Sequence, residues 1–143
     1  IALAAGKTKF VQAFSEFGPE RTGAPTKAFV RISDKEIRTV EQITKADYII
    51  LLDPTIDISG ISLKKGGKII ENSEKDIPAT KISEKFLGKN KPNTALLGAF
   101  AKISGMNKNN AINAIKELFG RKISKEMLDK NLLAFEEGYS LKN

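Results

Sequence analysis

The sequence contains no cysteine and no histidine among its 143 residues. Without cysteine thiolates the chain has no ligands for an iron–sulfur cluster, and without either residue type it cannot build the usual structural zinc site. A Ser–His or Cys–His nucleophile pair is excluded for the same reason. Any redox chemistry that involves this chain therefore has to be carried by groups on other chains.

Long apolar segments are also missing. No run of about 18 apolar residues occurs, so we expect no transmembrane helix and no membrane partner. No signal-peptide pattern is visible, and the cytoplasm is the default compartment. The chain begins at Ile1 rather than at methionine, from which we expect that an N-terminal piece is absent.

Positive charge is in excess, but it is not gathered into a basic stripe. The net charge is +7, with only four arginines, and residues 61–104 hold nine of the basic side chains against four acidic ones. The lysines of this segment alternate with apolar residues, as on a solvated face, and no aromatic residues interleave with them. We therefore expect no nucleic-acid partner.

One short segment, FGPERTGAP at residues 17–25, stands out for its composition. Two prolines fix their own φ angles and bias the residues before them toward extended geometry, and two glycines allow unusual backbone conformations. Such a segment cannot be a regular helix or a central strand. It predicts a shaped loop that carries one carboxylate and one guanidinium, and such loops on a rigid scaffold often carry function.

The segments before residue 90 have mainly the patterns of strands. Residues 10–14 and Thr26–Ser33 alternate apolar and polar side chains. Tyr48–Leu52 is a continuous apolar run, typical of a strand buried on both faces of a parallel sheet. We expect Gly66-Gly67 to make the turn into a second buried strand at 68–71, and Ala79–Phe86 to be a further strand.

The last third of the chain is predicted to be helical. Apolar residues recur at helical spacing in three segments, which begin near Asn93, Asn107 and Ser124. Asn93 and Ser124 are expected to cap their helices. Strands followed by helices favour an α/β sandwich, with a mostly parallel central sheet flanked by helices and a helical C-terminal third.

The chain also resembles a known family. The stretch FVQAFSEFGPERTGAPTKAFVRISDKEI, residues 10–37, is similar to the gamma subunit of pyruvate:ferredoxin oxidoreductase and of its relative that acts on branched-chain 2-oxoacids. The same family is matched in order by YIILLDPT (48–55), LKKGGKIIENS (63–73), NTALLGAFAKISG (93–105) and NLLAFEEGY (131–139). The resemblance covers essentially the whole chain and implies a single domain over 1–143. It also implies an N-terminal strand and a glycine-rich loop, which the chain lacks because it opens inside the helix that follows them.

The resemblance implies a role within a larger enzyme. That enzyme decarboxylates a 2-oxoacid oxidatively, transfers the acyl group to coenzyme A and passes electrons to ferredoxin. Thiamine diphosphate and Mg²⁺ would be bound by the alpha and beta subunits and iron–sulfur clusters by the beta and delta subunits. This chain would bind no cofactor alone and would be inactive without its partners, in the cytoplasm.

The loop residues are the first candidate site: Gly18, Pro19, Glu20, Arg21, Gly23 and Pro25. Arg21 could face a substrate or coenzyme A, with Glu20 orienting it, because a guanidinium matches carboxylate and phosphate geometry. The alternative is an ion pair within the loop or a contact with another subunit. Thr22 stands where relatives often carry a second arginine, which weakens any role that needs two adjacent cations.

Two further pairs of residues are candidates. Lys27 and Arg31 are expected on the outer face of their strand, with Phe29 between them, where they receive an anionic group or form a solvated or interface surface. Asp53 and Thr55 follow the predicted parallel strand, where ligands of open α/β sheets bind. They could contact a ribose, a metal or another chain, or only cap the following turn.

Three functions remain open at this point. The chain is a gamma subunit of the pyruvate enzyme or of the branched-chain (2-oxoisovalerate) enzyme, or it is a scaffold that only holds other subunits. The third possibility is a free-standing domain that binds a small molecule. The sequence does not choose between pyruvate and a branched-chain substrate.

Overall fold

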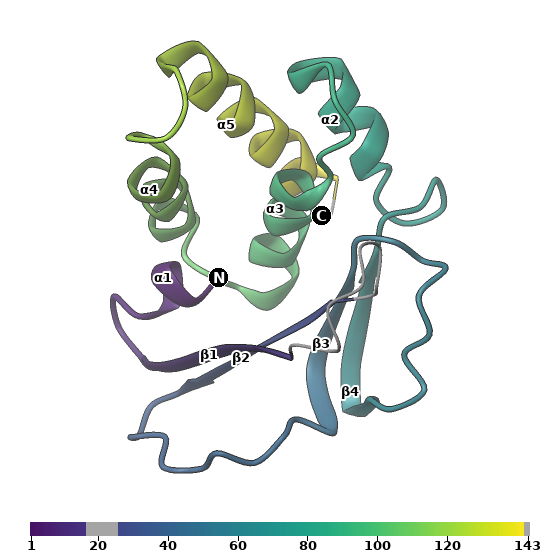
Figure 1. Cartoon of the computed structure of the whole chain (residues 1–143), viewed down its shortest axis with the longest axis vertical. Coiled ribbons are helices and arrows are strands. Elements are labelled where there is room, and N and C mark those ends of the chain that lie inside the picture. Colours follow the sequence, from purple (N-terminus) through teal and green to yellow (C-terminus); the bar gives the residue numbers. More distant parts are fainter. Residues whose placement is uncertain (17–25, 142–143) are drawn as a thin grey trace.

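The computed structural model describes residues 1–16 and 26–141, and it is of the predicted α/β class (Figure 1). In Figure 1 the helices gather on one side of the molecule and the strands lie along the other. The helical C-terminal third is confirmed. The elements are α1 (Ala2–Ala5), β1 (Phe10–Glu16), β2 (Lys27–Ser33), β3 (Lys45–Leu51), β4 (Ser62–Glu71), α2 (Ala79–Leu87), α3 (Asn93–Ser104), α4 (Lys108–Phe119) and α5 (Lys125–Ser140).

The described strands form two separate pairs. β1 and β2 are antiparallel, in a register that runs from Phe10 opposite Ser33 to Glu16 opposite Lys27. β3 and β4 are parallel, as predicted from their apolar runs. No helix among the described residues is long and apolar enough to cross a membrane.

The Gly66-Gly67 pair does not form a turn, and that prediction was wrong. Both glycines lie inside β4, where the pairing with β3 slips between Ala46 and Tyr48. Gly66 has a φ of 81°, a backbone conformation that residues with a side chain rarely adopt. A Cβ on Gly67 would lie 3.0 Å from the Asp47 carbonyl oxygen. The glycines therefore allow a bulge in a continuing strand, which is the other common reason for glycine in a strand.

The segment Ala79–Phe86 is a helix, not the predicted strand. α2 buries Ala79, Ile82, Ser83 and Leu87, a spacing of three and four residues that suits a helix. Its helical period was obscured because one of the buried positions is occupied by a serine. The Ser83 hydroxyl is satisfied there, since it donates to the Thr80 carbonyl oxygen at 2.8 Å.

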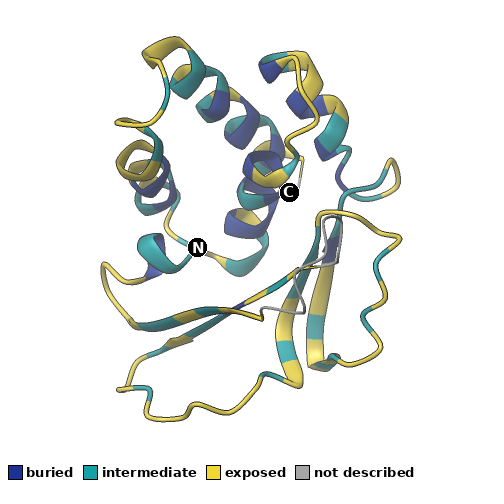
Figure 2. Ribbon diagram, viewed as in Figure 1, coloured by how far each residue is buried: buried dark blue, intermediate teal, exposed yellow. Residues whose placement is uncertain are grey.

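The core lies almost entirely among the helices, where Figure 2 shows most of the buried residues. α3 and α5 pack closely along their length, and Leu96 and Phe135 are at most 1% exposed. A second group, around Ala111 and Ile115 of α4, packs against Phe135. The helical third therefore holds most of the core, and the strands lie against it.

The parallel strands are less buried than predicted. Ile70 is fully buried against the helices, and the Tyr48 ring meets Phe100 of α3 edge-on with 5.4 Å between the ring centroids. On the opposite face, however, Ile69 is 43% exposed. The prediction of burial on both faces was wrong for this chain, because the described helices cover only one face of the β3–β4 pair.

Two helix N-termini were predicted to have side-chain caps, and one of them does. The Ser124 hydroxyl accepts a hydrogen bond from the Met127 amide at 3.2 Å, as expected for an N-cap. The cap position of α3 is Pro92, and Asn93 is the first helical residue, without the predicted capping bond. Thr94 instead donates to Asn131 of α5 at 3.1 Å, in the buried contact between the two helices.

Candidate functional site

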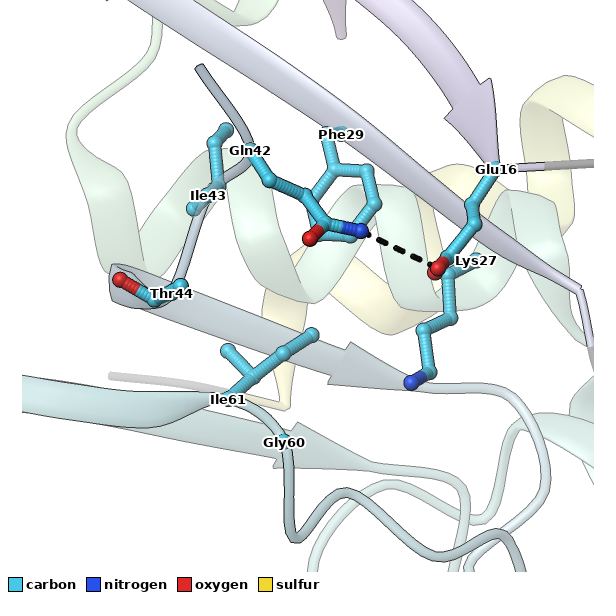
Figure 3. Close-up of a pocket in the computed structure, with 8 residues that line it drawn as sticks. All are labelled: Glu16, Lys27, Phe29, Gln42, Ile43, Thr44, Gly60 and Ile61. Atoms are coloured by element: carbon cyan, nitrogen blue, oxygen red, sulfur yellow. Dashed lines mark hydrogen bonds between the residues drawn. The ribbon is translucent and has the colours of Figure 1, made fainter.

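A pocket of about 200 Å³ lies beside the end of the β1–β2 hairpin (Figure 3). Glu16 and Lys27 are the terminal pair of the hairpin, so the pocket adjoins the two points between which the 17–25 segment is inserted in the sequence. The other walls come from the segment before β3 and the segment before β4. The lining residues are Glu16, Lys27, Phe29, Gln42, Ile43, Thr44, Gly60 and Ile61.

The hairpin turns the face with Lys27, Phe29 and Arg31 inward, against the prediction that this face is the outer one. Phe29 is 8% exposed and stacks on Phe14 of β1 with 5.3 Å between ring centroids, whereas Ile32 on the other face is 43% exposed. The reason is not local to the strand: the segment 39–44 folds back over this face and hydrogen-bonds to it.

Lys27 supplies the positive charge among the described lining residues. Its side chain extends from β2 toward Gly60 and Ile61, while the Gln42 amide donates to Glu16 Oε1 at 3.1 Å across the pocket mouth (Figure 3). The charge of Lys27 reaches Asp57 as well. The pKa of Asp57 is lowered first by hydrogen bonds from the amide and hydroxyl of Ser59 and then by the field of Lys27. The described lining thus offers the Lys27 ammonium, the Gln42 amide and the Phe29 ring, but also the Glu16 carboxylate, which accepts from Gln42. An anionic group is therefore favoured on the Lys27 side of the pocket and opposed on the Glu16 side.

Arg31 does not line the pocket, although it stands on the same face of the hairpin. Its Nη1 donates to Gln12 Oε1 at 2.7 Å, and its Nη2 donates to the Glu41 carbonyl oxygen. The guanidinium carbon also lies 5.4 Å from the centroid of the Phe14 ring. The contacts described for Arg31 are therefore made within the chain.

Asp53 and Thr55 are not brought to the pocket. Asp53 Oδ1 accepts hydrogen bonds from the Thr55 amide at 2.9 Å and from its hydroxyl at 2.7 Å. These bonds lower the pKa of Asp53, because they favour the charged carboxylate. These contacts match the alternative in which Asp53 caps the following turn. A ligand role for Asp53 and Thr55 stays a prediction.

The loop candidates lie outside the described residues, and they remain predictions. These are Gly18, Pro19, Glu20, Arg21, Gly23 and Pro25. Among the residues that the structure does describe, no three acidic side chains gather into a set that could hold a metal ion.

The sequence analysis missed the pocket residues contributed by connecting segments. Gln42, Ile43 and Thr44 lie in an irregular stretch, and Gly60 and Ile61 end a run of turns. Neither stretch has a motif or a period that would mark it. Only the position of Glu16, directly before the unusual loop, offered a signal that could have been used.

Comparisons with known proteins agree over nearly the whole chain. Residues 1–141 match the family model described as pyruvate ferredoxin/flavodoxin oxidoreductase. The chain is 40% identical to the pyruvate/ketoisovalerate oxidoreductases common subunit gamma of Thermococcus kodakarensis, over 98% of this chain and 85% of that protein. It is 35% identical to the pyruvate synthase subunit PorC of Thermotoga maritima, over 96% and 81%.

Solved structures share the same fold. The crystal structure of the pyruvate oxidoreductase subunit PORC from Thermotoga maritima superposes with a TM-score of 0.81 and 29% identity, covering 98% of this chain and 84% of that one. A 2-oxoglutarate:ferredoxin oxidoreductase from Magnetococcus marinus gives a TM-score of 0.68 at 19% identity, over 98% of this chain and 27% of that much longer one, which shows the fold alone. Agreement in sequence with the named subunits over nearly the whole of this chain, together with the matching fold, leads to one conclusion: this chain belongs to the pyruvate ferredoxin/flavodoxin oxidoreductase family.

Proposed function

We propose that this chain is the gamma subunit of a pyruvate:ferredoxin oxidoreductase, and that it is active only within that complex. The observation that carries the proposal is the match to gamma-type subunits at 35% to 40% identity over almost the whole chain. The complex would convert a 2-oxoacid anion and coenzyme A to an acyl-CoA, carbon dioxide, a proton and two electrons, and the electrons would pass to ferredoxin. The alpha, beta and delta subunits are its expected partners, in the cytoplasm.

The chemistry of the reaction would be supplied by groups held on those partners. Thiamine diphosphate with Mg²⁺ and the iron–sulfur clusters are expected on the other subunits, and the absence of cysteine and histidine from this sequence is consistent with that division. What this chain can contribute is position and charge. Its described pocket offers one ammonium group, that of Lys27, and one carboxylate, that of Glu16, beside an aromatic wall.

The site we propose is the hairpin end, with coenzyme A as the molecule it faces. Lys27 would attract an anionic group of coenzyme A into the pocket, and Arg21 of the adjoining sequence would supply a second cation. A scaffold role is the alternative, in which the same residues only contact another subunit. Asp53 and Thr55 are kept as a secondary candidate at the end of β3.

Isolation of the native complex tests the assignment as a gamma subunit. The tagged chain, recovered from extracts of its own cells, is expected to bring down other subunits and to reduce a low-potential dye when a 2-oxoacid and coenzyme A are both added. Pyruvate and 2-oxoisovalerate, assayed side by side, distinguish the pyruvate enzyme from the branched-chain one. Recovery of a lone, inactive chain would favour a free-standing binding domain and contradict the proposal.

Replacing Arg21 with alanine separates a ligand role from scaffolding. We expect kcat/KM for coenzyme A in the assembled complex to fall by roughly tenfold or more, the size of a lost charge-assisted hydrogen bond. We expect the melting temperature of the chain to change little, by less than the effect of a core substitution. Steady-state kinetics with varied coenzyme A, beside thermal unfolding, make the measurement.

Arg38→Ala is the matched control for that experiment. Arg38 is also an arginine, its side chain is 84% exposed, it pairs only with Glu36 in the described contacts, and it does not line the pocket. Its loss should leave the kinetics unchanged. If Arg21→Ala has the same kcat/KM for coenzyme A as Arg38→Ala, Arg21 does not contact the ligand. That result would favour the alternative in which the 17–25 segment only contacts other subunits.

A further inference from the structure

The segment that closes one side of the pocket is held to the hairpin by hydrogen bonds. Gln12 donates from Nε2 to the Thr39 carbonyl oxygen at 3.0 Å, and Arg31 donates from Nη2 to the Glu41 carbonyl oxygen. Arg31 also donates to Gln12 Oε1 at 2.7 Å, which fixes the amide that reaches Thr39. Arg31 thus takes part, directly or through Gln12, in the bonds at Thr39 and Glu41. The far end of the segment is held separately, because the Ser62 amide donates to the Thr44 carbonyl oxygen at 2.9 Å and Gln42 donates to Glu16 Oε1 at 3.1 Å.

Around Val40 little else anchors this segment. Residues 34–44 contain no helix or strand, and the side chain of Val40, between the two bonded carbonyls, is 91% exposed. Packing therefore contributes little at this point, and the hydrogen bonds decide where the backbone lies. The three residues that follow, Gln42, Ile43 and Thr44, form the wall of the pocket across from Lys27.

We propose that Arg31 is a positioning residue for the Lys27 pocket. It holds the segment 39–44 so that Gln42, Ile43 and Thr44 complete the pocket wall. Lys27 contacts the ligand, and Arg31 does not. The inference rests on the proposed function, in which the pocket receives an anionic group of coenzyme A. It gives the two residues different roles, whereas the sequence left open whether Lys27 and Arg31 both receive an anionic group or form a solvated or interface surface.

The chemistry of the side chain supports this division of roles. Two nitrogens of one planar group reach two acceptors that lie apart, and the plane lies near the Phe14 ring, with 5.4 Å from the guanidinium carbon to the ring centroid. A lysine ammonium keeps the charge but cannot reproduce this fork or the stacking on an aromatic ring. Lys27 acts as a point charge, so an arginine can replace it in attracting an anion.

The test uses the assembled complex with four variants: Arg31→Lys, Arg31→Gln, Lys27→Arg and Lys27→Gln. Each is assayed for KM of coenzyme A and for kcat at saturating coenzyme A, and hydrogen exchange is followed at the amides of residues 39–44. We expect both Arg31 variants to raise KM by about fivefold to tenfold and to speed exchange in the segment. Lys27→Gln should raise KM without affecting exchange, and Lys27→Arg should resemble the wild type.

Other results would overturn the inference in distinguishable ways. A normal KM in Arg31→Lys beside a raised one in Arg31→Gln would make Arg31 a direct charge contact. Faster exchange in both Arg31 variants with unchanged KM, while Lys27→Gln raises KM, would remove the positioning role but keep the pocket as the site. Unchanged KM in all four variants would overturn the pocket as a coenzyme A site together with the inference.

Gln12→Ala keeps the test decisive if an Arg31 variant fails to assemble. It removes the bond to Thr39 without changing any charge, and Gln12 does not line the pocket. A raised KM with faster exchange in this variant supports the positioning role. Faster exchange with a normal KM counts against it.

Discussion

Replacing either Gly98 or Gly138 with alanine is expected to destabilise the helical core by about 3 kcal/mol or more, the upper part of the range for overpacking. A Cβ at Gly98 would lie 2.1 Å from the Phe135 carbonyl oxygen, and one at Gly138 would lie 2.0 Å from the Ala95 carbonyl oxygen. Both contacts are with backbone of the facing helix, which cannot rotate away as a side chain could. α3 and α5 would have to separate along their length.

The intrinsic effect of the same change has the opposite sign. Alanine favours a helix over glycine by about 1 kcal/mol, so an exposed glycine in a helix would gain from the substitution. The clash at Gly98 and Gly138 outweighs that gain, because the α3–α5 contact holds much of the core, including the buried Leu96. We therefore expect a fall in melting temperature on the order of 10 °C in this chain of 143 residues.

Chemical denaturation of the purified chain measures the change in free energy of unfolding. Gly60→Ala is the matched control, because a Cβ at Gly60 would meet no atom within 4 Å and its φ is not in the left-handed region. That variant should stay within about 1 kcal/mol of the wild type. A Gly98→Ala protein as stable as Gly60→Ala would show that the two helices do not approach as closely as described.

Phe135→Ala is expected to cost about 3 to 5 kcal/mol, the range for truncating a buried aromatic side chain. Phe135 is 0% exposed and is the largest fully buried side chain among the described residues. It joins α5 to α4 and α1 through the group that contains Ala4, Ala111 and Ile115. Its removal would leave a cavity enclosed by helices that are already in contact and cannot close fully.

The comparison variant for Phe135 lies two residues away on the same helix. Leu133 is 51% exposed, so Leu133→Ala should change the free energy of unfolding by about 0.5 kcal/mol or less. Urea titration followed by circular dichroism would measure both. Equal losses in the two variants would contradict the assignment of Phe135 to the core and of Leu133 to the surface.

The sequence alone determined the class of the fold and much of the chemistry that this chain cannot perform. The helical third followed from apolar residues at a period that depends only on neighbours three or four positions apart. Because the chain has no cysteine and no histidine, it offers no thiolate or imidazole ligand to a metal ion or cluster, whatever its fold. The family followed from residue patterns spread over the whole chain, and the comparisons confirmed it.

Local patterns failed where a residue's role depends on what faces it. A serine at a buried position hid the apolar period of α2. Ser83 can be buried there because its hydroxyl donates to a carbonyl oxygen of the same helix. The glycine pair in β4 is read as a turn from the sequence, and only the slipped pairing with β3 makes it a bulge.

The tertiary structure alone decided where the candidate site lies and what holds it together. Phe29 faces inward because the segment 39–44 folds over it, and Arg31 reaches Glu41 for the same reason, while Gln12 is its neighbour across the hairpin. Gly98 and Gly138 are 40 positions apart, and each looks like a weak point of its helix until the two helices are seen to touch. Contacts between residues far apart in the chain leave no periodic signal in either segment, so they become visible only when the chain is folded.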